Sequence, residues 1–217
     1  FCVRLLRQHG DPLADVRSGF TRQFNIYDAA DQLTVVKGVF RELGLDDDFM
    51  KPRAALSIVG NAKSQGRTPR DFYREATSPK DEKLAVVYEK YEDALRSANA
   101  LDFDDLLLET VRLLRHSAEV RTWASSRFRY VMVDEYQDTN LAQYRIVRAL
   151  PVDHPNLAVT GDPDQPIYGW RGANVRNILD FEKDYPDAST VTLEQNYRST
   201  PNILQIANEV ISHNVHR

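Results

Sequence analysis

The chain has 217 residues, 42% of them apolar, so it can bury a substantial core and is not intrinsically disordered. Its formal net charge of −4 gives no support for a basic nucleic-acid-binding domain and by itself favours a protein or small-molecule partner. A single cysteine excludes an internal disulfide, and no apolar run approaches the roughly 18 residues of a membrane span, so we expect a soluble, cytoplasmic protein with no membrane partner.

Positive charge is concentrated in the first third of the chain. The cations are Arg4, Arg7, Arg17, Arg22, Lys51, Arg53, Lys63, Arg67, Arg70 and Arg74. A local basic surface can track the phosphates of a nucleic acid even on an acidic protein. The charge pattern alone is more typical of a solvated helical surface, and this is the interpretation we favour.

The front half of the chain carries helical patterns. Residues 1–7 resemble the middle of a helix, and residues 28–43 place apolar side chains at helical spacing before Gly44, a typical stop. Ser78, followed by a proline and then an acid, predicts the start of a long helix. Its apolar stripe continues for about four turns to Ala98.

A further helix is predicted to begin near Asp102. Asp104 and Asp105 follow in its first turn, where acids interact favourably with the helix dipole whatever the function of the protein. We therefore interpret both as helix-start charges and not as site residues.

After residue 127 the pattern changes to apolar segments that end in charged residues. They occupy residues 131–135, 157–162 and 191–194, and the gaps between them are long enough for a helix that crosses back over the sheet. This alternation predicts an α/β fold with three buried parallel strands. Because ligands bind at the carboxyl ends of such strands, we expect the three charged ends to share one site.

The first of these strands ends in Asp134 and Glu135, an acid pair of the kind found in nucleotide hydrolases. One carboxylate can hold Mg²⁺, and the second can accept a proton from the attacking water. Adjacent acids also occur in ordinary solvated turns, so the pair alone is a weak signal. The polar residues 136–140, and the helix predicted from Leu141, favour a site.

The second strand leads into residues 161–173, where glycines and prolines predict a rigid loop. Gln165 in this loop can donate an amide hydrogen to a phosphate oxygen. Tyr168 and Trp170 are two residues apart, and in an extended stretch they would point the same way, as a platform for stacked bases requires. A core position for both rings is the alternative.

The third strand is followed by polar residues and by a helix predicted from Asn202. Arg198 in this connection could neutralise charge on a transferring phosphoryl group. A surface arginine that pairs with an acid is the alternative, and the spacing leaves both open.

Three segments, in this order and spacing, resemble motifs II, III and IV of the UvrD/PcrA/Rep family of superfamily 1 DNA helicases. Their sequences are DEYQDTN at 134–140, GDPDQPIYGWRGA at 161–173 and LEQNYRST at 193–200. LDFDDLL at 101–107 resembles the short motif upstream of motif II in the same family. Matches of this length are highly specific, and the likeness covers nearly the whole chain.

The resemblance implies a role for each candidate residue at the nucleotide. Asp134 would bind Mg²⁺, Glu135 would be the general base, and Gln165 would sense the γ-phosphate of ATP. Tyr197 would stack on adenine, and Arg198 would act as an arginine finger.

The resemblance also implies a path for single-stranded DNA. Tyr168 and Trp170 would hold its bases, while Arg171 would help to couple the DNA site to the nucleotide site. Family members usually carry a small polar residue where Pro166 stands, and they vary at Pro163; neither difference removes a functional group.

The fold that the resemblance implies is part of a RecA-like parallel α/β motor domain with a mostly helical insertion. We expect residues 1–11 to belong to the first motor domain, 1A, and residues 12–98 to form the insertion known in the family as 1B. Residues 99–195 would continue domain 1A, and residues 196–217 would begin the second motor domain, 2A.

Nucleotide hydrolases of this type also need a glycine loop with Lys and Ser or Thr to cradle the phosphates. The nearest match, residues 60–68, has the wrong glycine spacing and Arg in place of Lys, and we expect a helix there. We therefore interpret the chain as a fragment that does not hydrolyse ATP by itself.

The function implied for the parent protein is 3′ to 5′ translocation along single-stranded DNA with duplex unwinding, driven by ATP and Mg²⁺. Its partners would be single-stranded DNA, junctions of single-stranded and duplex DNA, and repair or replication proteins. The alternatives are a non-catalytic module that docks DNA or protein, and the helicase portion of a helicase-nuclease. A phosphate loop upstream would favour the motor, and a nuclease signature far downstream would favour the last.

Overall fold

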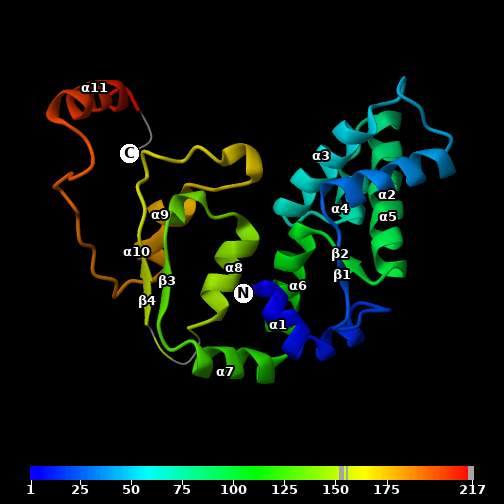
Figure 1. Ribbon diagram of the computed structural model, residues 1–217, viewed down its shortest axis with the longest axis horizontal. Helices are drawn as coiled ribbons and strands as arrows, with labels where there is room; N and C mark the ends of the chain where they lie inside the picture. Colours follow the sequence, from blue (N-terminus) through cyan, green and yellow to red (C-terminus); the bar gives the residue numbers. More distant parts are fainter. Residues whose placement is uncertain (152–153, 155, 215–217) are drawn as a thin grey trace. The chain divides into compact units, whose positions relative to one another are not determined.

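The computed structural model describes residues 1–151, 154 and 156–214, and for Arg171 it describes the backbone only. It divides into two compact units, the first made of Phe1–Val131 with Asn140–Ala158 and the second of Met132–Thr139 with Val159–Arg217. Figure 1 labels the helices and strands of both. The described residues thus form helices and short parallel strands, an α/β fold.

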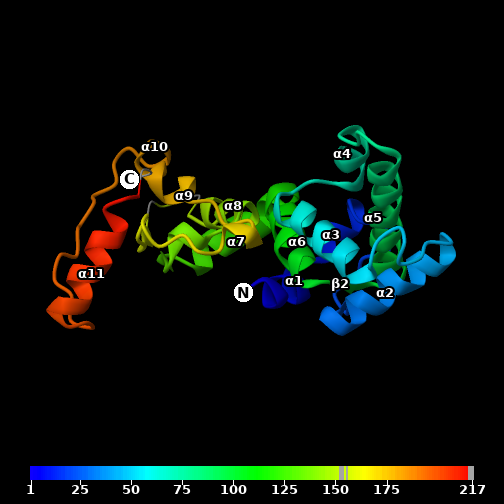
Figure 2. The same ribbon diagram turned by 90° about the horizontal axis from the view of Figure 1, so that it is seen from above.

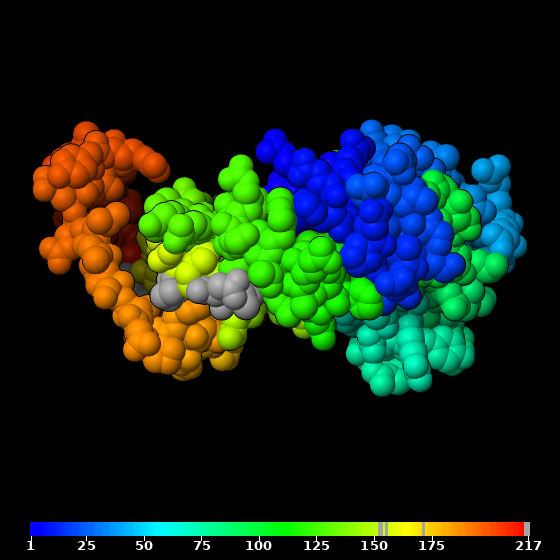
Figure 3. Space-filling model, turned by 90° about the horizontal axis from the view of Figure 1, so that it is seen from below, coloured from blue at the N-terminus to red at the C-terminus, as the bar shows by residue number. Residues whose placement is uncertain are grey.

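The first unit contains a hydrophobic core built from segments far apart in the sequence. The elements around it are α1 (Cys2–His9), η1 (Asp11–Asp15), α6 (Phe103–His116), α7 (Ala118–Arg127) and α8 (Leu141–Ala149). α6 packs against both α1 and α8, and Leu6 of α1 and Leu113 of α6 are fully buried in this core. Figure 3 shows the N-terminal segment in blue directly beside the green surface of this core. The helix predicted at residues 1–7 is confirmed.

A second hydrophobic core in the same unit lies among four other helices. They are α2 (Ala29–Glu42), α3 (Pro52–Ser64), α4 (Pro69–Arg74) and α5 (Pro79–Ser97). Figures 1 and 2 show α2, α3 and α5 side by side. The core is formed by residues 36–100, most of the predicted insertion, but Leu13, Phe20 and Phe24 belong to the first core. The boundaries of the insertion stay a prediction.

Both long helices of this core begin at a capping side chain, of which the sequence predicted that of Ser78. Asp28 accepts from the backbone N–H groups of Ala30 and Asp31 at the start of α2, and Gly44, at φ +63°, follows its end. Ser78 accepts from the backbone N–H of Asp81 at the start of α5. The stripe of α5 is buried as far as Leu95, whereas Ala98 lies beyond the helix and is exposed.

A short strand pair in the first unit escaped the sequence analysis, which predicted only helices there. β1 (Asn25–Ile26) and β2 (Ala100–Leu101) pair in parallel, with Asn25 opposite Ala100. Strands of two residues are too short to show alternation, and their partner lies some 75 positions away along the chain.

β3 (Val131–Val133) and β4 (Leu157–Val159) form a second parallel pair, with α8 in the connection between them. The backbone N–H of Val131 donates to the carbonyl of Asn156, and that of Thr160 donates to Val133, so both strands advance in the same direction. The predicted parallel strands are confirmed, but their burial is not, because the middle residue of β3, Met132, is 76% exposed. One side of the pair is partly buried and the other is exposed.

The prediction of a third strand is wrong. Residues 191–194 form no strand, and Val191 and Leu193 are 80% and 88% exposed. A strand is stabilised by hydrogen bonds to a neighbour, and in the described part of the chain no strand lies alongside this segment. The helix predicted after it is confirmed as α11 (Pro201–Ile211).

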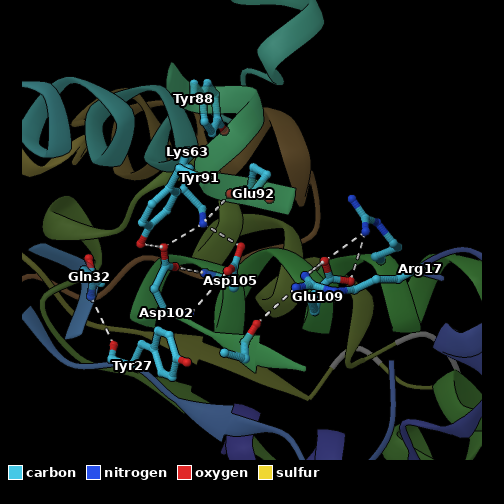
Figure 4. A network of polar contacts seen from close by, with 12 residues as sticks. Arg17, Tyr27, Gln32, Lys63, Tyr88, Tyr91, Glu92, Asp102, Asp105 and Glu109 are labelled. Carbon is cyan, nitrogen blue, oxygen red and sulfur yellow. Dashed lines mark hydrogen bonds and ion pairs between the residues drawn. The ribbon is translucent and has the colours of Figure 1, made fainter. Parts of the chain in front are cut away.

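The two cores of the first unit are joined by a buried cluster of charged side chains (Figure 4). The ammonium of Lys63, on α3, lies 2.8 Å from a carboxylate oxygen of Glu92 on α5 and 2.7 Å from those of Asp102 and Asp105 at the start of α6. The hydroxyl of Tyr91 also donates to Asp102 at 2.9 Å. Lys63 is 1% exposed, and its ion pairs join three helices.

Burial and neighbouring charges shift the pKa values of Lys63 and Asp102 in opposite directions. Burial alone would lower the pKa of Lys63, but Asp105, Asp102 and Glu92 hold it well above its ordinary value. Burial would raise the pKa of Asp102, yet the charge of Lys63 and several hydrogen bonds lower it. One ammonium does not compensate three carboxylates, and burial raises the pKa of Asp105 to about 7 despite Lys63.

Three sequence interpretations are corrected by these contacts. Lys63 and Arg17 are not surface cations: both are buried, and Arg17 donates to Glu109 at 2.7 Å and to the carbonyl of Ala100. Asp105 is not only a helix-start charge, since its carboxylate accepts from the backbone N–H of Asp102 and also pairs with Lys63 of α3. The acids lie 29 to 92 positions from their cations, so local charge spacing could not reveal the pairs.

Lys63→Met should destabilise the chain by about 3–5 kcal/mol, because the buried carboxylates of Asp102 and Asp105 and the partly buried one of Glu92 would lose their cation. The measurement is the free energy of unfolding in urea. Lys90→Met is the matched control: Lys90 pairs with Glu42 on the surface, where both side chains are about half exposed, and its loss should cost less than about 1 kcal/mol. Equal effects of the two changes would contradict a buried cluster.

The raised pKa of Asp105 predicts a specific pH dependence. Between about pH 4 and pH 7 the unfolded chain has released this proton while the folded chain retains it, so rising pH favours unfolding. The difference in unfolding free energy between the unmodified chain and Asp105→Asn should therefore fall as pH rises, by at most about 1.4 kcal/mol per pH unit. A difference that stays constant across this range would show that Asp105 is ionised in the fold.

Candidate functional site

The acid pair lies directly after β3, on the second unit. Asp134 and Glu135 are both exposed, and Glu135 has left-handed backbone angles, φ 51° and ψ 47°, which are uncommon for a residue other than glycine. One carboxylate oxygen of Asp134 accepts from the hydroxyl of Thr160 at 2.6 Å and from the backbone N–H of Glu135 at 3.0 Å. These hydrogen bonds, that of Thr160 first, lower the pKa of Asp134 and keep it ionised.

The segment after β4 runs beside the acid pair. The backbone N–H of Tyr136 donates to the carbonyl of Thr160 at 2.9 Å, continuing the register of the strand pair. Beyond it, the amide of Gln165 donates to Asp162 at 2.8 Å, and Gln165 is exposed. The structure therefore brings the ends of the first two strands together, as the sequence predicted.

Gln137 connects these two segments and is almost completely buried. Its amide nitrogen donates to Glu135 at 2.7 Å, and its amide oxygen accepts from the backbone N–H of Asp162 at 3.1 Å. The close approach requires a glycine at position 161, since a Cβ there would lie 2.4 Å from the amide oxygen of Gln137 and 2.8 Å from Cδ1 of Ile178.

The buried residues of the DEYQDTN segment hold the turn in place. Tyr136 is fully buried in the short helix η2 (Tyr136–Asp138), and its ring meets Phe181 of α10 (Phe181–Asp184) edge to face. Asn177, on α9 (Arg176–Leu179), donates its amide hydrogens to the carbonyl and hydroxyl of Thr139. The exposed acids thus stand on a packed support.

The predicted aromatic platform is exposed but is not extended. Tyr168 and Trp170 are 39% and 67% exposed, so neither ring belongs to the core. Trp170 lies in the 3-10 turn η3 (Gly169–Arg171), and Tyr168 caps it with ψ 22°, so the premise of an extended stretch is wrong. Glycines on both sides of Trp170 favour a turn over a strand. The side chain of Arg171 lies outside the described part of the structure.

Tyr197 and Arg198 lie in an exposed connection before α11. The side-chain oxygen of Asn196 accepts from the backbone N–H groups of Arg198 and Ser199, so the polar segment forms a turn. In the described residues, no hydrogen bond or ion pair joins the side chain of Arg198 to an acid. The structure therefore brings together the predicted residues of the first two segments but not those of the third.

The acids do not form a ready-made metal cage. Among the residues that the structure describes, no group of three or more His, Cys, Asp or Glu side chains could hold a metal ion. Mg²⁺ bound with a nucleotide commonly uses only one or two protein carboxylates, since phosphates and waters supply the other ligands. An exposed, ionised Asp134 fits that pattern.

Comparison of the sequence with known proteins identifies its family. A family model described as the UvrD/REP helicase N-terminal domain matches residues 1–186. The chain belongs to the UvrD/REP helicase family. It is 47% identical over 216 residues to the ATP-dependent DNA helicase PcrA of Staphylococcus aureus, and 46% identical to that of Staphylococcus epidermidis.

These alignments cover the whole of this chain but only 29% of the length of either PcrA protein. The family members to which it is similar are thus more than three times as long. Within the described residues of this chain, no helix combines the length and apolar character needed to cross a membrane.

Two contributors to the site were not singled out by the sequence analysis. Gln137 and Thr160 bind the acids, yet a polar residue in a turn and a threonine at a strand end are common features. The only local signal was Gly161, which follows Thr160 and permits the backbone to approach Gln137. Residues 60–64 belong to helix α3, as the sequence predicted, so the stretch 60–68 does not form a phosphate loop.

Proposed function

We propose that the full-length protein hydrolyses ATP to move 3′ to 5′ along single-stranded DNA and to unwind duplex DNA. The observation that carries this proposal is the hydrogen-bonded junction of two parallel strand ends, one bearing Asp134 and Glu135 and the other bearing Asp162 and Gln165. A relative of 47% identity that is named an ATP-dependent DNA helicase supports it. The RecA-like architecture, with an inserted domain 1B and a second motor domain, is part of the proposal.

The two acids of the pair would have different roles at the nucleotide. Asp134, kept ionised by Thr160, would hold Mg²⁺, which when bound neutralises charge on the phosphates. Glu135 would accept the proton of the attacking water, because its carboxylate is exposed and one of its oxygens is already fixed by Gln137. Gln165 would contact the γ-phosphate, and its exposed amide can leave Asp162 to do so.

Residues of the third segment would complete the nucleotide site. Arg198 would act as the arginine finger, and Tyr197 would stack on adenine. Both side chains are exposed, and Tyr197 is 87% accessible, so neither is committed to the core of the described chain.

Single-stranded DNA would bind at the loop after β4. Tyr168 and Trp170 present exposed rings, on which bases of any sequence can stack. Arg171 would help to couple this loop to the nucleotide site. The proposed substrates are single-stranded DNA and its junctions with duplex DNA, and repair or replication proteins are proposed partners.

Glu135→Gln tests the proposed chemistry in the full-length protein. The amide keeps the shape of the side chain but cannot take a proton, so DNA-stimulated phosphate release should fall about 100-fold or more while nucleotide binding is retained. Steady-state phosphate release and binding of a non-hydrolysable ATP analogue are the measurements. Turnover within a few-fold of the unmodified protein would exclude Glu135 as the base.

Trp170→Ala tests the proposed DNA contact. Affinity for a single-stranded oligonucleotide should weaken by about 1–3 kcal/mol with little dependence on sequence, and the melting temperature should change little. Trp123→Ala is the matched control, because the other tryptophan packs half-buried against His9 and Phe128. It should lower the melting temperature and leave the affinity of the folded protein unchanged. The reverse pattern would remove Trp170 from the DNA site.

A further inference from the structure

Gln137 is the buried side chain that faces the exposed acids. It is 1% exposed, and its two polar atoms have different partners. A carboxylate oxygen of Glu135 can only accept, and the backbone N–H of Asp162 can only donate. The partners therefore fix the orientation of the amide, with its nitrogen toward Glu135 and its oxygen toward Asp162.

The support under Gln137 leaves it little freedom. It lies in η2, whose turn is closed by a hydrogen bond from the backbone N–H of Asp138 to the carbonyl of Glu135 at 2.9 Å. The preceding ring of Tyr136 is fully buried, and Gly161 allows the opposite backbone to close over the amide. Because Gln137 is fixed in this way, its hydrogen bond can fix the carboxylate of Glu135.

Glu135 itself adopts an uncommon backbone conformation. Left-handed angles in a residue other than glycine cost free energy, and such residues are concentrated at functional sites. The turn directs its carboxylate to within 2.7 Å of the buried amide although the residue is exposed. A buried glutamine needs hydrogen-bond partners in any fold, but here one partner is an exposed carboxylate that water could equally satisfy.

We propose that Gln137 is a positioning residue, which holds the carboxylate of Glu135 for proton transfer and ties it to the backbone of the loop after β4. This inference rests on the proposed role of Glu135 as the general base. Movement of the loop at Asp162, which leads to Gln165 and the exposed aromatic residues, would move Gln137 and with it the base. The amide of Gln137 thus links the position of the loop to the position of the Glu135 carboxylate.

Two near-isosteric variants of the full-length protein separate the two hydrogen bonds. Gln137→Met keeps the length of the side chain and loses both. Gln137→Glu keeps an acceptor for the backbone N–H of Asp162 but places a second carboxylate against Glu135. Each should lower kcat for DNA-stimulated ATP hydrolysis about 10- to 100-fold, because a small displacement of a catalytic group is costly.

Binding of mant-AMPPNP, a fluorescent ATP analogue that is not hydrolysed, should change less than threefold in both variants. Hydrogen exchange, followed by mass spectrometry of peptides that cover residues 160–165, supplies a readout independent of activity. Exchange should become faster in Gln137→Met and stay as in the unmodified protein in Gln137→Glu. A role limited to folding would instead lower nucleotide binding, melting temperature and turnover together.

The decisive comparison is made in a Glu135→Gln background. There Gln137→Met should cause no further loss of turnover, because the group that it positions has been removed. A further 10-fold loss in that background would overturn the proposal, as would turnover within twofold of the unmodified protein in either single variant. Unchanged exchange in Gln137→Met would also overturn it.

Failure of this inference can be distinguished from failure of the proposed function. If Glu135→Gln abolishes turnover but the Gln137 variants do not reduce it, only the positioning role is wrong. If Glu135→Gln itself leaves turnover intact, Glu135 is not the base, and the positioning role falls with it.

Discussion

The parallel pairing of β3 with β4 is the constraint on which the candidate site depends. Three residues in each strand are enough to set a register, and that register continues beyond the strands through the hydrogen bond from Tyr136 to Thr160. Thr160 is thereby placed against Asp134, and the backbone of Asp162 against Gln137. A shift of one residue would turn these side chains to the opposite face and separate the acids from their partners.

The same kinds of residue serve different purposes in the two units because their surroundings differ. Asp105 is buried with two other acids around Lys63, and its pKa is raised to about 7. Asp134 is exposed, and hydrogen bonds lower its pKa. Asp102 and Asp105 of LDFDDLL therefore bind helices together, while Asp134 and Glu135 of DEYQDTN remain exposed to a ligand. Burial, rather than residue type, separates a structural acid from a candidate catalytic one.

Local patterns predicted the helices well. Ser78 caps α5 as expected, and α2 begins after Asp28 as the apolar spacing predicted, since these signals involve only nearby residues. Patterns failed where a partner distant in the sequence was needed. The pairing of β1 with β2 was missed, and residues 191–194 were expected to form a strand although no strand pairs with them in the described chain. Charge spacing likewise predicted that Lys63 and Arg17 are surface cations, because the acids that pair with them lie on other elements.

The sequence by itself determined the family, the acid pair at a strand end and the order of its motifs, because these are contained in short continuous segments. It also placed Gln165, Tyr168 and Trp170 in a loop, for the same reason. Only the tertiary structure decided that Gln137 joins Glu135 to Asp162, that Thr160 binds Asp134, and that Lys63 is buried among three carboxylates. Each of these contacts depends on how the chain folds in space, and its strength depends on burial, which no spacing along the chain specifies.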